Sequence, residues 1–215
     1  MEEMKKEVLT DAAESRQAVQ TGNSVTDRNG TRLKLIQAGI EEINRHSVTG
    51  FSVRRVAAAC GVSCATPARH FGDRYGFLSA IIDYVNGQWA EVQRRLLDEN
   101  AGSMQDQIVA VSIGYIDFLV KNPHFRSILT LKDDQFDNVY HRRRGEMSSP
   151  TQNLIDAYCK SLDVPEETRM RKVLLIRSLI FGSALIFDTG EIPYTDQTRE
   201  IMRSTIEEIL IQPDS

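Results

Sequence analysis

The stretch from Ser52 to Arg74 reads as two short helices joined by a tight turn, and the rest of the chain has to fold around that pair. An apolar stripe at helical spacing marks the first helix, residues 53–60: Val53, Val56, Ala57 and Cys60. Ser52 stands at its N-cap, Gly61 can take the left-handed conformation that ends it, and Ser63 is expected to cap a second helix, residues 64–70. Two short helices with so tight a turn cross steeply, so the second one projects outward and fits a major groove.

Helical spacing also runs through the rest of the chain. Residues 33–43 form a first helix with one apolar stripe, made of Leu33, Ile36, Ile40 and Ile43. Asp73 is expected to cap a long helix from Arg74, and Asn122-Pro123 ends the helix after that one. Further helices are expected over residues 151–162, 166–187 and from 196 onward, with residues 133–149 irregular. Because no segment alternates as a strand does, we predict an all-α fold.

Charge is distributed unevenly along the chain. The whole sequence has a net charge of −4, yet residues 28–74 hold eight basic and three acidic side chains, a local +5. Arg54 and Arg55 belong to this basic segment and are expected to point away from the apolar stripe of their helix. A basic segment on an acidic chain can bind phosphates while the remainder stays soluble.

The segment from about Arg32 to Arg74 resembles the DNA-binding domain of the TetR (tetracycline repressor) family of bacterial transcription regulators. The resemblance rests on Leu35-Ile36, Ala38, Ser52-Val53, Ala57, Gly61-Val62-Ser63, His70-Phe71 and Arg74. It implies a helix-turn-helix DNA-binding domain over residues 28–74 and a helical ligand-binding and dimerisation domain over residues 75–215. Residues 1–27, rich in mixed charge, are expected to be a flexible extension; an arm that touches DNA is the alternative.

The second helix of the pair and the residues around it supply the candidate DNA contacts. The side chains expected to meet base edges are Arg54, Cys64, Ala65, Thr66 and Ala68. Arginine can bind guanine through two hydrogen bonds, and alanine methyl groups can pack on thymine methyls. Those expected to contact phosphates are Ser52, Arg69, His70 and Arg74, although His70 also reads as a packing residue. Many family members have an aromatic residue where this chain has Ala68, so one contact is lost.

The resemblance further implies a small-molecule effector that binds in the C-terminal part and releases the DNA, which is the family's usual repressor behaviour. Aromatic candidates for the effector pocket are Trp89, Tyr115, Phe118, Phe125, Phe136, Tyr140 and Phe181, and each reads equally well as a core residue. The arginine run at residues 142–144 reads as a solvated helix end, with an anion or second DNA contact as the alternative. The last two helices carry more apolar surface than one subunit can cover, so we predict that they pair as a four-helix bundle in a homodimer that binds a roughly palindromic operator.

Other functional classes find little support in the sequence. It contains no phosphate-binding glycine loop, no Gly-x-Ser-x-Gly and no HExxH motif, so we expect neither an enzyme nor a cofactor. The three cysteines, Cys60, Cys64 and Cys159, lack metal-ligand spacing, and a redox switch at the first two is the alternative to ordinary packing. No signal peptide or membrane span is evident, so a cytoplasmic protein is expected. The competing class is an all-α protein-interaction module that has lost specific DNA binding.

Overall fold

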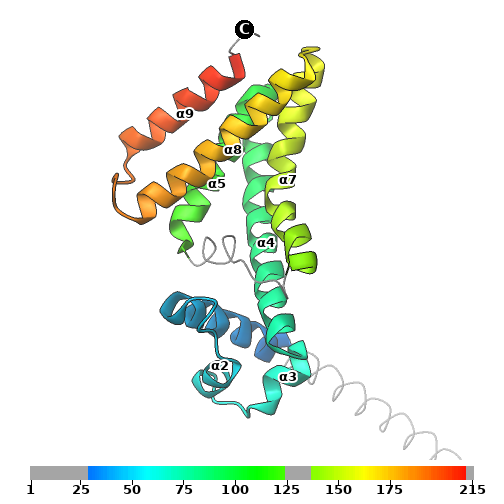
Figure 1. Ribbon diagram of the computed structural model, residues 1–215, viewed down its shortest axis with the longest axis vertical. Coiled ribbons are helices and arrows are strands. Elements are labelled where there is room, and N and C mark those ends of the chain that lie inside the picture. The colour runs from blue at the N-terminus through cyan, green and yellow to red at the C-terminus, as the bar shows by residue number, and fades with distance from the viewer. Residues whose placement is uncertain (1–28, 124–136, 212–215) are drawn as a thin grey trace, which may run out of the picture.

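The computed structural model describes residues 29–123 and 137–211, and for residues 137–148 it describes the backbone alone. Within these ranges every regular element is a helix, which confirms the all-α prediction. The elements are a helix over residues 29–46, α2 (Val53–Ala59), α3 (Ala65–Phe71), α4 (Arg74–Glu99), α5 (Met104–Lys121), α7 (Asp137–Ser161), α8 (Glu166–Asp188) and α9 (Asp196–Ile211). The helices before α4 form a head, α5 and α7–α9 form a body, and α4 runs from one into the other (Figure 1).

The head has its own apolar core, built between the helix over residues 29–46, α2 and the first turns of α4. Leu35, Ile36 and Ile43 are fully buried in it. Gly39 faces α4, and a Cβ there would lie 2.8 Å from the Ile81 Cδ1 atom, so a larger residue would require the Ile81 side chain to shift. The prediction that Leu33 belongs to the buried stripe is wrong, because Leu33 lies on the flank of that face and is 41% exposed.

The long helix α4 is shared between the two parts of the molecule. Its first turn is capped by Asp73, whose carboxylate accepts a hydrogen bond from the Gly76 N–H at 2.7 Å, as predicted. The buried stripe of α4 contacts the head core as far as Ile82 and the body core from Val85 onward. At 1.5 Å per residue its 26 residues span about 39 Å, so a tilt of α4 in the body displaces the head.

The body is built around α5, which is buried along most of its length against α4, α7, α8 and α9. A capping box begins this helix: the Ser103 hydroxyl accepts from the Asp106 N–H at 3.1 Å, and the Asp106 carboxylate accepts from the Ser103 N–H at 3.2 Å. The helix ends at Lys121, directly before Asn122-Pro123, as predicted.

Helix α7 begins earlier than the sequence indicates. Residues 133–149 were expected to be irregular because Gly145 and the segment before Pro150 favour turns, yet the backbone is helical from Asp137 and Pro150 lies inside the helix. This part of the prediction is wrong. Contacts of α7 with α4, α5 and α8 supply the tertiary packing that overrides local helix propensity.

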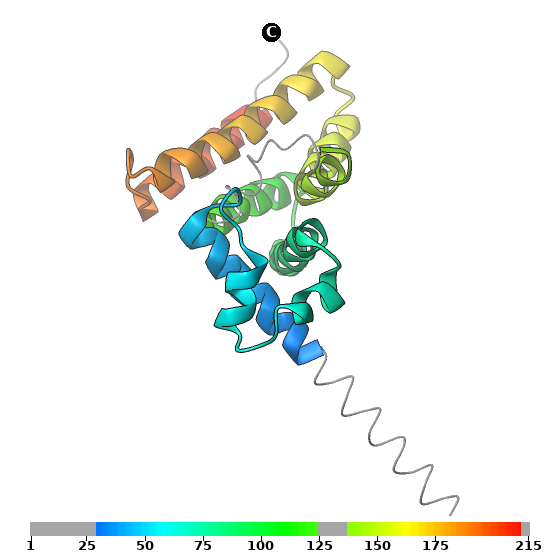
Figure 2. The same ribbon diagram turned by 60° about the horizontal axis from the view of Figure 1, so that its bottom comes forward.

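The apolar helix α8 is covered on one face only. Ile176, Ile180 and Ala184 are buried against the body core, whereas Leu174 and Leu185 are 66% and 57% exposed. Within a single chain, the other face of α8 is therefore left open. In both views α8 and α9 lie beside each other along one side of the body (Figures 1 and 2).

Candidate nucleic-acid interface

The turn between α2 and α3 has the geometry that a helix-turn-helix requires. Gly61 adopts a φ of 67°, in the left-handed region that favours glycine, and ends α2. The Val62 N–H then donates to the Ala57 carbonyl at 3.0 Å, and the Val62 side chain packs against the head core. The chain is thereby fixed on both sides of the turn, and α3 leaves it as a separate short helix.

Helix α3 presents small side chains to solvent. Cys64, Ala65, Ala68 and Arg69 are exposed, Thr66 is half-buried, and Pro67 is the buried residue that faces the head. The prediction that Ser63 caps this helix is wrong, because the N-cap is Cys64 and no side chain bonds to the free N–H groups. The Ser63 hydroxyl instead lies 3.0 Å from the Thr66 hydroxyl.

Two exposed cations on this unit are free to meet a ligand. Arg54, on the first turn of α2, and Arg69, on the last turn of α3, make no hydrogen bond or ion pair with any residue in the described ranges. Their guanidinium groups therefore need not leave a protein partner before binding an acceptor on DNA. Arginine of this kind suits both guanine edges and phosphates.

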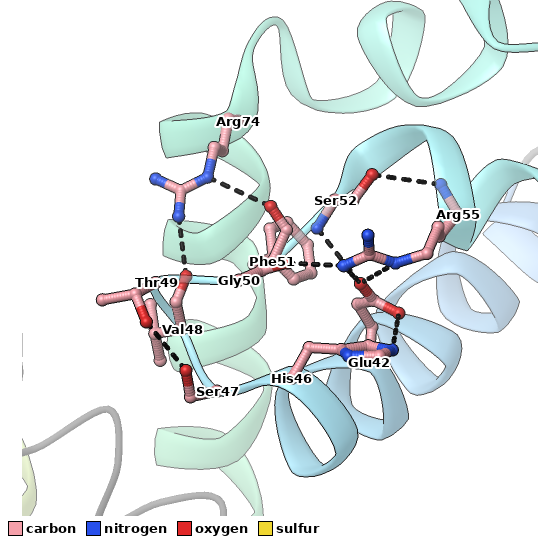
Figure 3. Close-up of polar contacts among 10 residues, drawn as sticks. All are labelled: Glu42, His46, Ser47, Val48, Thr49, Gly50, Phe51, Ser52, Arg55 and Arg74. Atoms are coloured by element: carbon pink, nitrogen blue, oxygen red, sulfur yellow. Dashed lines mark hydrogen bonds and ion pairs between the residues drawn. The ribbon is translucent and has the colours of Figure 1, made fainter.

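Arg55 behaves differently from its neighbour Arg54, because its side chain turns back to Glu42 on the helix over residues 29–46 (Figure 3). The Arg55 Nε donates to the Glu42 Oε1 atom at 2.7 Å, and its Nη2 also pairs with that carboxylate. The Ser52 N–H donates to the same oxygen at 3.3 Å, while the Ser52 hydroxyl accepts from the Arg55 N–H at 3.4 Å and so caps α2 as predicted. Arg55 points away from the apolar stripe of α2, as expected, but unlike Arg54 it has a carboxylate partner.

Glu42 is the buried member of this network, with only 6% of its surface exposed. Burial raises the pKa of its carboxyl, but hydrogen bonds and charge from Arg55, the Ser52 N–H and the nearby His46 outweigh that effect, so the pKa is lowered overall. The carboxylate is therefore charged at neutral pH. It fixes the start of α2, where Arg54 stands, to the helix that supports the head.

Arg74 ties α4 to the connection between the first helix and α2. Its Nη2 donates to the Val48 carbonyl at 2.6 Å and its Nε to the Phe51 carbonyl at 3.4 Å (Figure 3). The guanidinium also lies over the Tyr75 ring, 5.8 Å from its centre. These contacts give Arg74 a structural role, because it links α4 to the connection before α2. Its contact with a DNA phosphate stays a prediction.

The other candidates for phosphate contact lie nearby in the chain. His70 is half-buried and its ring is 5.9 Å from that of Phe71, which in turn stacks on Phe77 in the head core at 4.1 Å. Ser52 is half-buried at the start of α2. Both lie on the α2–α3 unit, and their contacts to DNA stay predictions.

Four of the seven aromatic candidates for the effector pocket come together in the body. The Trp89 ring stacks on Tyr115 at 4.7 Å and is tilted against Phe118 at 5.4 Å, and Phe181 meets the Tyr115 ring edge-on at 5.9 Å. Burial raises the pKa of the Tyr115 hydroxyl, against the opposing effect of the Arg177 charge. Phe125 and Phe136 lie outside the described residues, as do the side chains of Tyr140 and of the arginines at 142–144.

Other kinds of site find no support in the described ranges. No three His, Cys, Asp or Glu side chains there lie together as metal ligands would. No helix in those ranges is long and apolar enough to cross a membrane. Cys60 is half-buried with its thiol directed at the Lys34 carbonyl, and burial raises its pKa, whereas Cys64 is exposed and Cys159 buried. A raised thiol pKa disfavours the reactive thiolate at Cys60.

No family model and no curated protein matches this sequence, but solved structures match its fold. A TetR family transcription regulator from Marinobacter aquaeolei VT8 has a TM-score of 0.69 at 18% identity, over 87% of this chain and 97% of its own. FadR from Bacillus subtilis, solved with stearoyl-CoA, has a TM-score of 0.69 at 14% identity, over 83% and 97%. AibR, solved with isovaleryl coenzyme A and operator DNA, has a TM-score of 0.62 at 14% identity, over 86% and 100%. The chain has the TetR-family fold.

Within this TetR-family fold, the sequence pattern predicts the helix-turn-helix and its exposed residues, but not the network of Glu42, Ser52 and Arg55 that holds it in place. The signal was present in the spacing of Leu35, Gly39 and Glu42, which places an acidic residue on the buried face of the first helix. A buried acid needs a cationic partner, and Arg54 and Arg55 are the candidates on the following helix.

Proposed function

We propose that this protein is a sequence-specific DNA-binding transcription regulator, with residues 28–74 as its DNA-binding part and residues 75–215 as its regulatory part. The observation that carries the proposal is the exposed α3, together with the free cations Arg54 and Arg69, on a head whose helices are linked by the hydrogen bonds of Glu42 and Arg74. The TetR-family fold adds support, since several proteins that share it are named transcriptional regulators. The −4 net charge does not oppose this function because the positive charge is concentrated in the head.

In this proposal the residues of the head divide into two groups. Arg54 and the residues on α3, Cys64, Ala65, Thr66 and Ala68, meet base edges in the major groove. Ser52, Arg69, His70 and Arg74 contact phosphates and position the helix without reading sequence. Arg54 carries the largest share of sequence preference, because a guanidinium bound to guanine through two hydrogen bonds contributes about 1–3 kcal/mol of discrimination.

The proposed regulator acts as a homodimer. Met170, Leu174 and Leu185 form one exposed stripe on α8, and Ile201 and Ile211 are exposed on the neighbouring α9. Burying a leucine side chain contributes about 1.5–3 kcal/mol, so pairing these faces as a four-helix bundle supplies substantial binding free energy. A twofold dimer presents two copies of α3 to DNA, which calls for a roughly palindromic operator.

A small-molecule effector in the body would release this repressor from its operator. Because α4 contacts both apolar cores, a ligand that favours one orientation of α4 also favours one spacing of the two heads. Two structures with the same fold, FadR and AibR, were solved with an acyl-CoA, which supports a ligand-responsive body. The required property of the effector is tighter binding to the state that cannot bind DNA.

Selection from a random-sequence duplex library by the purified full-length protein tests this function. The proposal predicts enrichment of a roughly palindromic sequence and a strong decrease in its affinity as salt rises. Failure to enrich any sequence over repeated rounds would contradict it. That result would favour the all-α protein-interaction module.

A further inference from the structure

The core of the body contains four polar side chains whose hydrogen-bonding groups are unpaired. They belong to α4, α5 and α7, and each is at most 5% exposed: Gln93, Ser112, Tyr115 and Thr151. No residue of the described ranges bonds to the Gln93 Nε2, the Ser112 or Thr151 hydroxyl, or the Tyr115 hydroxyl. Buried polar atoms are nearly always paired in folded proteins, and an unpaired one costs stability. A group of four therefore points to a partner that the described residues do not supply.

Contacts in the body bring these four side chains to one region. The Trp89 ring of α4 stacks on the Tyr115 ring of α5, and these two helices run in opposite directions (Figure 1). Gln93 lies one turn after Trp89 and Ser112 about one turn before Tyr115, so both fall on the same side of the stacked rings.

Arg177 on α8 connects the fourth residue to this region. Its Nη1 donates to the Gln152 Oε1 atom at 3.4 Å, and Gln152 is the neighbour of Thr151 on α7. The same guanidinium is close enough to Tyr115 for its charge to act on that hydroxyl. Gln152 and Tyr115 therefore both lie close to Arg177, and Thr151 is adjacent to Gln152 on α7.

The chemistry of the four groups specifies what they would bind. The Gln93 Nε2 can only donate, and each of the three hydroxyls can donate one hydrogen bond, so the site offers four donor groups and no obligatory acceptor. The positive charge of Arg177 acts on the Tyr115 hydroxyl. A carboxylate offers about four lone pairs to donors and is stabilised by several hydrogen bonds and by nearby positive charge.

We propose that Gln93, Ser112, Tyr115 and Thr151 hold the carboxylate of a small organic acid, with its apolar part against the Trp89, Phe118 and Phe181 rings. This inference deepens the proposed function, because the acid would be the effector that acts through α4. It adds a ligand class, a monocarboxylic acid, and three polar residues, Gln93, Ser112 and Thr151, that an aromatic pattern alone does not identify.

Calorimetry and thermal unfolding of the full-length protein test this site. The probes are acetate, butyrate, hexanoate, octanoate, benzoate and phenylacetate, each compared with its primary amide at equal ionic strength. At least one acid should raise the melting temperature and bind about tenfold or more tighter than its amide, the smallest effect expected of a charge-assisted hydrogen bond.

Tyr115→Phe separates ligand binding from a structural role. Removing an unpaired buried hydroxyl should leave the melting temperature of the free protein unchanged or higher, while the acid loses about tenfold or more in affinity. Tyr84→Phe is the matched control, since its half-buried hydroxyl is already paired with the Gln88 amide at 3.1 Å, and its acid affinity should equal that of the wild type.

Three results would overturn the inference: no acid in the set binds, acids and amides bind equally, or Tyr115→Phe retains full affinity. A lower melting temperature of Tyr115→Phe without any acid binding would mean that the four groups hold buried water only. DNA binding is measured on the same preparation. Intact DNA binding without acid binding contradicts this inference alone, whereas loss of both contradicts the proposed function.

Discussion

Glu42 is a charged side chain in the apolar part of the head, and its burial is tolerated because Arg55 and the Ser52 N–H bind its carboxylate. Glu42→Gln keeps the shape but removes the charge, so we expect the free energy of unfolding to fall by about 1 kcal/mol, since Arg55 is half exposed. Urea unfolding measures this change. Glu41→Gln is the matched control, because its pair with Arg45 is exposed on both sides and should contribute about 0–0.5 kcal/mol. Equal losses in the two variants would contradict the assigned role of Glu42.

The same carboxylate makes a pH-dependent contribution to stability. The pKa of Glu42 is lowered below its ordinary value of 4.5 in the folded state, so the folded state favours the charged form. Its contribution is fully present above the ordinary pKa and is lost as pH falls through the lowered folded pKa. The stability difference between wild type and Glu42→Gln should therefore shrink between pH 7 and about pH 3. A difference that stays constant over that range would contradict the lowered pKa.

The burial and the partners of single side chains were the hardest features of this structure to predict from the sequence. Helical spacing identified Ile36 and Ile43 as buried, but it could not distinguish the centre of that face from its flank, where Leu33 is exposed. It also could not assign a partner to Arg55, because pairing with Glu42 depends on how two helices cross rather than on the spacing within either one. The contacts of Arg54 and the α3 residues with DNA remain predictions.

A buried lysine on α8, Lys172, binds the last turn of α9. The Lys172 Nζ donates to the Ile209 and Leu210 carbonyls at 2.8 and 3.1 Å, in the last turn of α9, where carbonyls lack partners within the helix. Lys172→Met should lower the free energy of unfolding by about 1–3 kcal/mol and speed amide exchange at the end of α9. Lys160→Met, at an exposed position in α7, is the control and should change little. Unchanged exchange in α9 would contradict the role of Lys172.

Most helices could be predicted from the sequence because their apolar spacing and end signals agree. Asp73 before α4, Asn122-Pro123 after α5 and Pro165 before α8 all fall at helix ends. The start of α7 could not be predicted, since Gly145 and Pro150 favour turns locally and only packing against other helices favours the helix there. Ser63 failed as a cap for a smaller reason: α3 begins one residue later than expected, after Cys64.

At the scale of the whole molecule, the exposed stripe on α8 predicts the oligomeric state. The variant Leu174→Glu/Leu185→Glu puts two charges into the proposed interface, where burial without a partner is costly, so the dimer should dissociate. Light scattering should give the wild type about twice the chain mass of 24.3 kDa and the variant the mass of one chain. Leu162→Glu is the matched control, because Leu162 is 55% exposed directly after α7 and belongs to neither α8 nor α9, so this variant should stay dimeric. A wild type with the mass of one chain would contradict the dimer.

The strongly apolar sequence of α8 indicated that most of its surface is buried against other helices. The sequence alone cannot tell whether those helices belong to the same chain or to a second copy. The structure covers the Ile176 and Ile180 side and leaves the Leu174 side open. The resemblance to the TetR family predicted the fold correctly over both head and body, at identities of only 14–18% to the solved structures compared above.

The claim that the α2–α3 unit reads DNA sequence is tested most directly by comparing affinities for two duplexes, the selected one and a scrambled one. Wild type, Arg54→Ala and Arg69→Ala are each titrated into both. Wild type should bind the selected duplex far more tightly. Arg54→Ala should reduce that preference about tenfold or more, whereas Arg69→Ala should weaken binding to both duplexes alike and lower the salt slope by about one. A preference that Arg54→Ala leaves intact would contradict the claim that the α2–α3 unit reads DNA sequence through this arginine.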